Sequence, residues 1–246
     1  MEQYPADYRD RTYRNWTIKN HLIGFNVTVR ETDLFISADT NLTSIALASV
    51  HRLRSSLESY ITAHREFLTS LTPVVYDEWA PEIVREMMRA SAKAGVGPMA
   101  AVAGAMAEHV GRDLLLHTRN VIIENGGDIY LKSINDVLVG LFAGRSPLSG
   151  RVSIKVRKEE MPLGVCTSSG TVGHSLSFGR TDACCVKSGS VALADAAATA
   201  IGNIVKSKKD LQNGLKTGMK IEGVLGMVII IGDQLGVVGD IELVKE

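Results

Sequence analysis

Residues 192–203 read Ala-Leu-Ala-Asp-Ala-Ala-Ala-Thr-Ala-Ile-Gly-Asn, and this alanine-rich stretch decides the fold. Ser190, just before it, is of a type that caps helix N-termini, so the sequence predicts a helix over residues 191–205. One stripe of this helix is apolar and is expected to pack in the core: Leu193, Ala197, Ala200, Ile201 and Ile204.

The opposite face of that helix carries Asp195 and Thr199, which are four residues apart and therefore neighbours, with Ala198 and Gly202 beside them. A carboxylate and a hydroxyl one turn apart offer two hard oxygen ligands to Mg²⁺, and water, carbonyl or phosphate oxygens can fill its other positions. The spacing is common in helices. On spacing alone, an exposed Asp–Thr pair without a metal is the stronger alternative.

A second segment of small residues covers 95–109, Gly-Val-Gly-Pro-Met-Ala-Ala-Val-Ala-Gly-Ala-Met-Ala-Glu-His. Pro98 suits the first turn of a helix, and Gly97 before it could hold a phosphate at the helix N-terminus. The apolar stripe of this helix is Met99, Val102, Met106 and Val110. The opposite face, with Ala101, Gly104 and Glu108, is mostly small, which predicts that another element or a ligand approaches the backbone closely.

The rest of the chain alternates between strand and helix patterns. Apolar periodicity predicts helices over residues 43–71 and 81–95. Strands are predicted at 26–30, 34–38, 120–124, 128–131, 137–143, 152–157, 164–169, 183–187, 224–231 and 236–244. We therefore expect residues 1–246 to form a single α+β domain with mixed or antiparallel sheets and packed helices. Residues 95–131 and 190–244 share a faint helix–strand similarity, which a duplication or two ordinary units would explain.

Two loops carry groups suited to phosphate. Residues 167–175 read Thr-Ser-Ser-Gly-Thr-Val-Gly-His-Ser and combine hydroxyls, glycine amides and an imidazole. His174 could bind an oxyanion or move a proton near neutral pH, and the alternative is a flexible turn with a surface histidine. Asn125-Gly-Gly-Asp128 predicts a tight turn in which glycine supplies positive φ, and by itself Asp128 is more typical of a turn than of a catalyst.

Composition excludes several classes of protein. The chain has 27 Lys and Arg against 27 Asp and Glu, so its net charge of zero argues against a protein that coats nucleic acid or an anionic membrane. Its three cysteines include no Cys-x-x-Cys pair and make a poor disulfide framework. No apolar run reaches the roughly 20 residues of a membrane helix, and no signal peptide is visible. We expect a soluble, cytoplasmic protein.

Four motifs occur in an order that resembles a known family. They are Ala103-Gly-Ala-Met-Ala-Glu-His-Val110, Asn125-Gly-Gly-Asp-Ile129, the Thr-Ser-Ser-Gly loop with His174, and Leu193-Ala-Asp-Ala-Ala-Ala-Thr-Ala200. Together they resemble the FAD:protein FMN transferases known as ApbE, once labelled thiamine biosynthesis lipoproteins, and most of all an uncharacterised cytoplasmic branch of that superfamily. The resemblance runs from about Gly95 to the C-terminus.

The resemblance implies an ApbE-like fold and a specific chemistry. Mg²⁺ would be held by Asp195, Thr199 and a backbone carbonyl near Ala103 or Gly104, and would bridge the FAD pyrophosphate. A Ser or Thr hydroxyl of an acceptor protein would attack the FMN-side phosphorus, and AMP would leave. His174 falls where the family has its functional histidine. The residues expected to contact FAD or FMN are Gly97, Gly126, Gly127, Asp128, Thr167, Ser168, Ser169, Gly170 and Thr171.

Two departures from the family pattern leave three functions open. The chain has His174-Ser-Leu-Ser-Phe-Gly179 where the transferases have His-Ile-Ile-Asp-Pro-x-Thr-Gly, and residues 101–107 lack the family's lysine and tyrosine. The first hypothesis is a Mg²⁺-dependent transferase or hydrolase acting on FAD or another nucleotide pyrophosphate. The second is a flavin- or nucleotide-binding protein without catalysis, which the two departures favour over a full transferase. The third is a structural or assembly protein that forms a homo-oligomer through its small helix faces.

Overall fold

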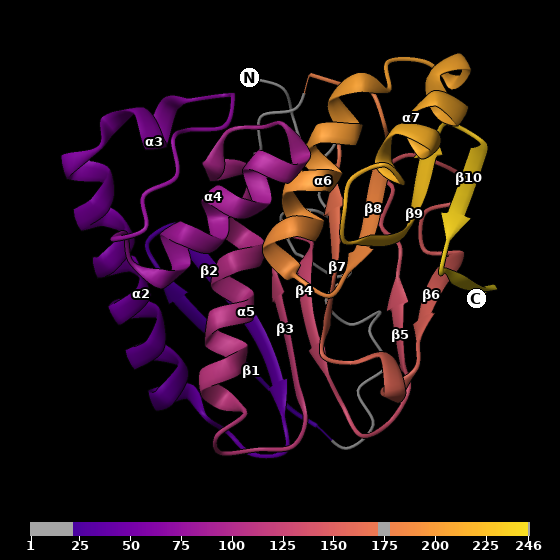
Figure 1. Cartoon of the computed structure of the whole chain (residues 1–246). Helices are drawn as coiled ribbons and strands as arrows, with labels where there is room; N and C mark the ends of the chain where they lie inside the picture. The colour runs from indigo at the N-terminus through magenta and orange to yellow at the C-terminus, as the bar shows by residue number, and fades with distance from the viewer. Residues whose placement is uncertain (1–21, 172–177, 246) are drawn as a thin grey trace.

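A computed structural model describes residues 22–171 and 178–245 of the chain. In this part of the chain, eight strands form one large antiparallel sheet in the order β1-β2-β3-β4-β7-β8-β9-β10 (Figure 1). Their bounds are β1 (Ile23–Val29), β2 (Thr32–Ala38), β3 (Val121–Asn125), β4 (Asp128–Lys132), β7 (Leu163–Ser168), β8 (Ala183–Ser188), β9 (Val224–Ile231) and β10 (Gln234–Gly239).

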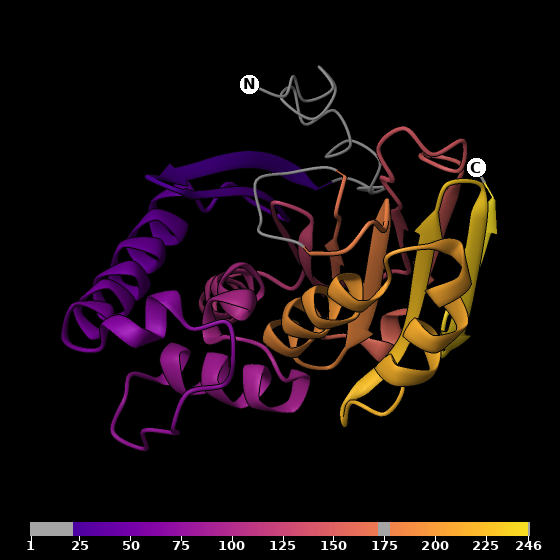
Figure 2. The ribbon, with the colours of Figure 1, turned by 90° about the horizontal axis from the view of Figure 1, so that it is seen from above.

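Helices cover one face of the large sheet (Figure 2). Their bounds are α2 (Thr43–Ala63), α3 (Arg65–Thr69), α4 (Glu82–Ala94), α5 (Val102–Leu114), α6 (Val191–Ile204) and α7 (Leu211–Gly218), with 3-10 turns η2 (Pro98–Ala101), η3 (Lys158–Glu160) and η4 (Lys208–Asp210). A second antiparallel sheet of β5 (Val137–Gly140), β6 (Val152–Val156) and β11 (Glu242–Lys245), in the order β11-β6-β5, packs on the other face.

The central strands of the large sheet are therefore buried on both sides. On β8, Cys184 packs in the helical core and its neighbour Cys185 packs in the core beneath the small sheet. The same alternation on β3 directs Ile123 toward the helices and Ile122 toward the small sheet. This arrangement is the α+β domain with antiparallel sheets and packed helices that the sequence predicts.

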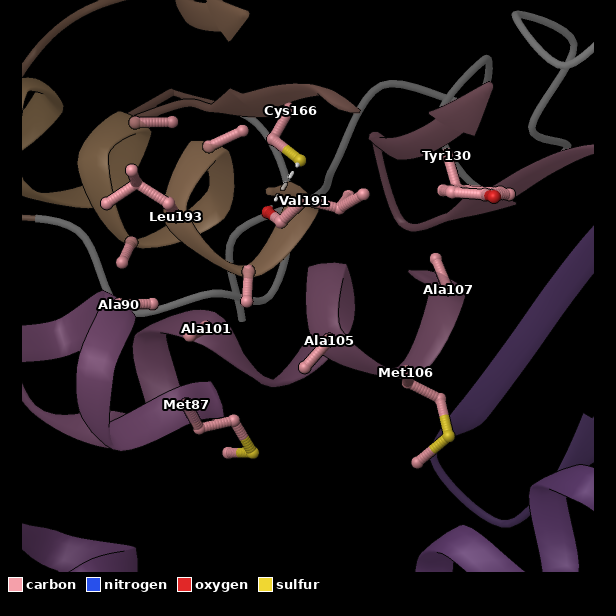
Figure 3. Packing of buried hydrophobic residues seen from close by; sticks show 14 of the residues in the cluster. Met87, Ala90, Ala101, Ala105, Met106, Ala107, Tyr130, Cys166, Val191 and Leu193 are labelled. Carbon is pink, nitrogen blue, oxygen red and sulfur yellow. Dashed lines mark hydrogen bonds between the residues drawn. The ribbon is translucent and has the colours of Figure 1, made fainter. Parts of the chain in front are cut away.

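Helix α6 lies in the middle of the helical layer and touches β7, β8, α4 and α5. Small residues permit these approaches (Figure 3). A Cβ atom on Gly164 of β7 would lie 2.7 Å from the Cα atom of Val191, and one on Gly104 of α5 would lie 2.4 Å from the Val191 carbonyl oxygen. The small face predicted on the second alanine-rich helix thus packs against another element, α6.

Three local predictions differ from the structure. The helix expected over 43–71 ends at Ala63, because His64 leaves helical geometry (φ −129°, ψ 75°), and a short α3 follows. The strand expected over 236–244 is two strands in different sheets, and the φ of +77° at Gly239 lets the chain turn between them. Ile204, expected in the core stripe, is 41% exposed. The internal similarity of residues 95–131 and 190–244 stays a prediction.

We expect Gly104→Ala to lower the free energy of unfolding by about 1–3 kcal/mol, because the added methyl group would overlap backbone atoms of α6. The matched control is Gly189→Ala, since Gly189 is exposed and has no atom within 4 Å of the new Cβ. It should change stability by less than about 1 kcal/mol. Urea denaturation followed by circular dichroism measures both variants. Equal stability of the two would show that α5 and α6 do not need this close contact.

Candidate functional site

The Asp195 carboxylate lies at the contact between α5 and α6. Its Oδ2 atom accepts a hydrogen bond of 2.9 Å from the backbone N–H of Gly104. The first N–H groups of a helix have no partner within that helix, so Asp195 serves one of the unpaired donors at the start of α5. Burial raises the pKa of Asp195 to about 7, although the N–H groups of Gly104 and Ala103 favour the charged form.

Asp128, at the start of β4, is a second carboxylate in the same region. It is buried, and burial together with the nearby charge of Asp195 holds its pKa well above the usual range. Contacts from the Cys166 thiol and the Thr167 backbone N–H act in the opposite direction. A buried carboxylate whose pKa is raised by the charge of a neighbouring carboxylate is a favourable setting for a cation, because the cation's charge would offset both.

The Asn125-Gly-Gly-Asp128 turn packs against the start of α5. The Asn125 side-chain amide donates a hydrogen bond of 3.0 Å to the carbonyl oxygen of Ala103. The Glu124 carboxylate accepts one of 2.9 Å from the Gly127 N–H. Gly126 (φ +68°) and Gly127 (φ +107°) have the positive φ that the sequence predicts for this turn. The turn thereby connects Asp128 to the same helix end that holds Asp195.

Thr199 follows Asp195 by one turn of α6 and is partly buried. The strand β7 runs beside α6: the Cys166 Sγ atom lies 3.5 Å from the Val191 carbonyl oxygen (Figure 3), and the Ser168 Oγ atom would lie 3.5 Å from a Cβ on Gly202. The structure thus brings β7 and its Thr167–Ser168 end alongside the helix that carries Asp195 and Thr199.

The hydroxyl-rich loop after β7 makes hydrogen bonds with its own surroundings. The Gly170 N–H donates to the Thr181 carbonyl (2.9 Å), and the Thr171 N–H donates to Ser169 Oγ (3.1 Å). The Thr171 hydroxyl donates to an Asp182 carboxylate oxygen (3.0 Å). In this arrangement the two amides are already used, so a phosphate at this loop would meet hydroxyl groups or require the loop to rearrange.

The described site does not include two of the predicted residues. His174 lies outside the described residues. Gly97 packs against residue 70, because a Cβ there would lie 1.8 Å from the Ser70 carbonyl oxygen. The close contact gives Gly97 a packing role at the start of η2, and its contact with a phosphate stays a prediction.

An ionic network that joins the buried Glu108 and His109 to the exposed Arg112 fixes the N-terminus of α6. Glu108 of α5 accepts the Val191 N–H at 2.8 Å with Oε2 and an Arg112 nitrogen at 2.5 Å with Oε1. Arg112 also donates to Glu86 of α4 at 2.8 Å, and His109 contacts the other oxygen of Glu86 at 2.9 Å. The network therefore ties α4, α5 and α6 together one turn from Asp195.

Sequence reasoning missed Glu108, Asn125 and Cys166 as parts of this region. From the sequence alone, Glu108 is equally consistent with a solvated charge, and Asn125 with a turn residue. In the structure Cys166, Cys184 and Cys185 are buried and free of disulfides. Burial raises the pKa of each thiol, so none is poised as a nucleophile.

This chain resembles known proteins in its sequence and in its fold. Residues 14–235 match the model of the protein family described as AbpE bacteria, and the chain belongs to this family. UPF0280 protein MJ1526 of Methanocaldococcus jannaschii is 42% identical over 226 residues, which cover 89% of this chain and 92% of the relative. A UPF0280 protein of Methanocella arvoryzae is 41% identical over 212 residues, which cover 86% of each chain.

Solved structures of flavin transferases share the fold. The flavin transferase ApbE from Vibrio cholerae superposes with a TM-score of 0.57 at 13% identity, over 89% of this chain and 96% of that one. The apo form of the flavinyl transferase ApbE from Pseudomonas stutzeri superposes with a TM-score of 0.56 at 12% identity, over 89% and 94%. The ApbE-like fold expected from the sequence motifs is therefore confirmed. Among the described residues, no helix has the length and apolarity to cross a membrane.

The network around Glu86 predicts a pH dependence of stability. Although burial acts against the charge, His109 and Arg112 lower the pKa of Glu86 from 4.5 to about 2. Between pH 4.5 and about pH 2, Glu86 is protonated in the unfolded chain and ionised in the folded chain. The stabilisation that ionised Glu86 contributes is therefore complete above about pH 5 and is lost as the pH falls toward 2. Glu86→Gln should lower the free energy of unfolding by about 1–3 kcal/mol at pH 7.

Chemical denaturation of both proteins at several pH values measures this difference, which should shrink steadily below about pH 5. The control is Glu159→Gln, whose side chain is 67% exposed. It should stay within about 0.5 kcal/mol of the unchanged protein at every pH. A Glu86→Gln difference that is independent of pH would contradict the electrostatic account of the network.

Proposed function

We propose that this protein binds the Mg²⁺ complex of FAD, or of another nucleotide pyrophosphate, at the contact between α5 and α6. We propose further that it breaks the pyrophosphate bond by transfer to an acceptor hydroxyl or to water. The observation that carries the proposal is the partly buried Asp195 carboxylate, which the Gly104 N–H holds and whose charge acts on the buried carboxylate of Asp128. Both acids lie where burial makes an uncompensated charge costly, and a divalent cation would remove that cost.

The residues at this place fit magnesium by their chemistry. In residues 22–171 and 178–245, no three His, Cys, Asp or Glu side chains are grouped to hold a metal. A cation here would therefore rely on mixed oxygen ligands, which is what Mg²⁺ accepts together with water and phosphate. Asp195 supplies a carboxylate and Thr199 a hydroxyl, and the Ala103 carbonyl oxygen, which accepts a hydrogen bond of 3.0 Å from the Asn125 amide, is proposed as a further ligand.

The chain's own groups would orient the substrate. Gly104 fixes the rotamer of Asp195, Glu108 fixes the N-terminus of α6, and the hydroxyls of Thr167, Ser168 and Ser169 come from the strand end beside α6. When bound, Mg²⁺ would neutralise charge that develops on the phosphate oxygens. His174 is proposed to contact that phosphate.

The reaction balances as a substitution at phosphorus. The hydroxyl oxygen of a Ser or Thr on an acceptor protein, or of water, bonds to the FMN-side phosphorus. The bond from that phosphorus to the bridging oxygen breaks, AMP leaves with the electron pair, and the hydroxyl proton passes to a base or to solvent. The names of the two structural relatives, both flavin transferases, support FAD as the first substrate to test.

A second candidate function is binding of flavin or nucleotide without catalysis. The altered sequence His174-Ser-Leu-Ser-Phe-Gly179 and the missing lysine in residues 101–107 favour it. A cytoplasmic location and a homo-oligomer stay predictions.

Calorimetric titration with FAD tests the site. We expect the unchanged protein to bind FAD at least about tenfold more tightly with Mg²⁺ than with a chelator, because the cation screens the pyrophosphate from two carboxylates. Asp195→Asn should abolish this dependence on Mg²⁺, and Thr199→Val should reduce it. The control is Asp136→Asn, an exposed carboxylate that contacts Lys155 and the Lys158 N–H before β5.

AMP release from FAD, followed by chromatography, then separates the two functions: release indicates a transferase or hydrolase, and binding without release indicates a binding protein. The proposal is wrong if neither FAD nor any other nucleotide pyrophosphate tested binds, or if Mg²⁺ strengthens binding to the Asp195→Asn protein as much as to the unchanged one.

A further inference from the structure

A cavity lies outside the α5–α6 site, between the end of α2, α3, the irregular segment that follows and Met88 of α4. Figure 1 shows α2, α3 and α4. Its volume is about 620 Å³, a size that accommodates small molecules. Residues 73–79 line one side of it without helix or strand structure. None of its lining residues belongs to the candidate nucleotide site.

The walls of this cavity are aromatic. The Tyr60 ring stacks on His64 with centroids 4.3 Å apart, and Phe67 meets Tyr60 edge-on at 5.4 Å. Across the cavity, Tyr76 is 43% exposed and Trp79 is 88% exposed. Because Trp79 is exposed beside other aromatic rings, its apolar ring face is available to a ligand.

The same cavity is lined by three carboxylates. Asp77 is fixed in place, because it accepts hydrogen bonds from the Tyr60 hydroxyl (3.2 Å) and the Trp79 N–H (2.9 Å). Glu66 and Glu78 are exposed at its edge. Among the described residues that line the cavity, none is lysine or arginine. The lining is therefore acidic as well as aromatic.

Two cationic side chains of α4 stand just outside the lining. The Arg89 guanidinium lies 5.2 Å from the centroid of the Tyr76 ring and donates 2.5 Å to its hydroxyl. Arg85 donates to the Glu78 carbonyl oxygen at 3.3 Å. Arg89 shows that a ring of this cavity already interacts with a cation. Among the salt bridges of the described residues, neither guanidinium pairs with Glu66 or with the Glu78 carboxylate, and the Glu66 Oε1 atom lies 3.7 Å from the Nδ1 atom of His64.

We propose that this cavity binds an aliphatic polyamine in its ammonium form. Aromatic faces attract ammonium groups and pack on methylene spacers, and the three carboxylates pair with successive charges along the chain. A single small ammonium ion would fill only a small part of 620 Å³ and would meet one of the carboxylates at a time.

Calorimetric titration of the full chain with spermidine at physiological salt tests the proposal. We expect saturable binding that weakens at least about tenfold in Trp79→Ala, because a ring face is lost. The Glu66→Gln, Glu78→Gln double variant should also weaken it about tenfold, because two pairing charges are lost. The matched control removes two carboxylates elsewhere, Asp136→Asn with Glu159→Gln, and should bind as the unchanged protein does.

Two further measurements keep the result unambiguous. Hexaamminecobalt(III) has the charge of spermidine without its methylene chain and should bind more weakly than spermidine. Sedimentation should give the same mass for the unchanged protein and Trp79→Ala. The proposal is overturned if spermidine shows no saturable binding, if the two trivalent cations bind equally, or if the site and control variants lose equal affinity. It is also overturned if the protein is a dimer that Trp79→Ala dissociates, because the surface would then be a contact between copies.

Discussion

The hydrogen bond from the Gly104 N–H to the Asp195 carboxylate is the contact on which the rest of the structure depends. It exists only because α5 has no side chain where α6 crosses it, with the Val191 carbonyl 2.4 Å from the place a Cβ would occupy. That crossing sets the position of α6 between the sheet and the other helices. It also places one carboxylate at the unpaired N–H groups of a neighbouring helix.

The crossing of α5 and α6 also brings together acidic side chains that the fold alone does not require. Burial raises the pKa of Asp195 to about 7 and holds that of Asp128 well above its usual range, so the folded chain keeps two acids in an unfavourable place. Glu108 and Glu86 differ, because arginine, histidine and backbone N–H groups pair with them. Stabilising charges and costly charges thus lie side by side, a contrast typical of functional sites.

Much of this could be predicted from the sequence where the signal is local. Helix periodicity placed Asp195 beside Thr199, and Asn-Gly-Gly predicted the turn that ends at Asp128. The partners of those residues could not be predicted, since Glu108 meets Val191 across 83 positions and Asn125 meets Ala103 across 22. Local patterns also failed at His64 and Gly239, where single backbone angles end a helix and redirect a strand. The aromatic cavity depends on residues 73–79, which have no periodicity to interpret.

The central claim is that Asp195 and Thr199 together hold a divalent cation at the crossing of α5 and α6. A crystal structure of the protein grown with FAD and Mn²⁺ in place of Mg²⁺ tests it most directly, because anomalous scattering locates manganese without reference to the ligand. The account predicts a peak about 2.2 Å from an Asp195 carboxylate oxygen, with the Thr199 hydroxyl and a pyrophosphate oxygen also bound. FAD seated elsewhere, or manganese bound away from both side chains, would contradict it.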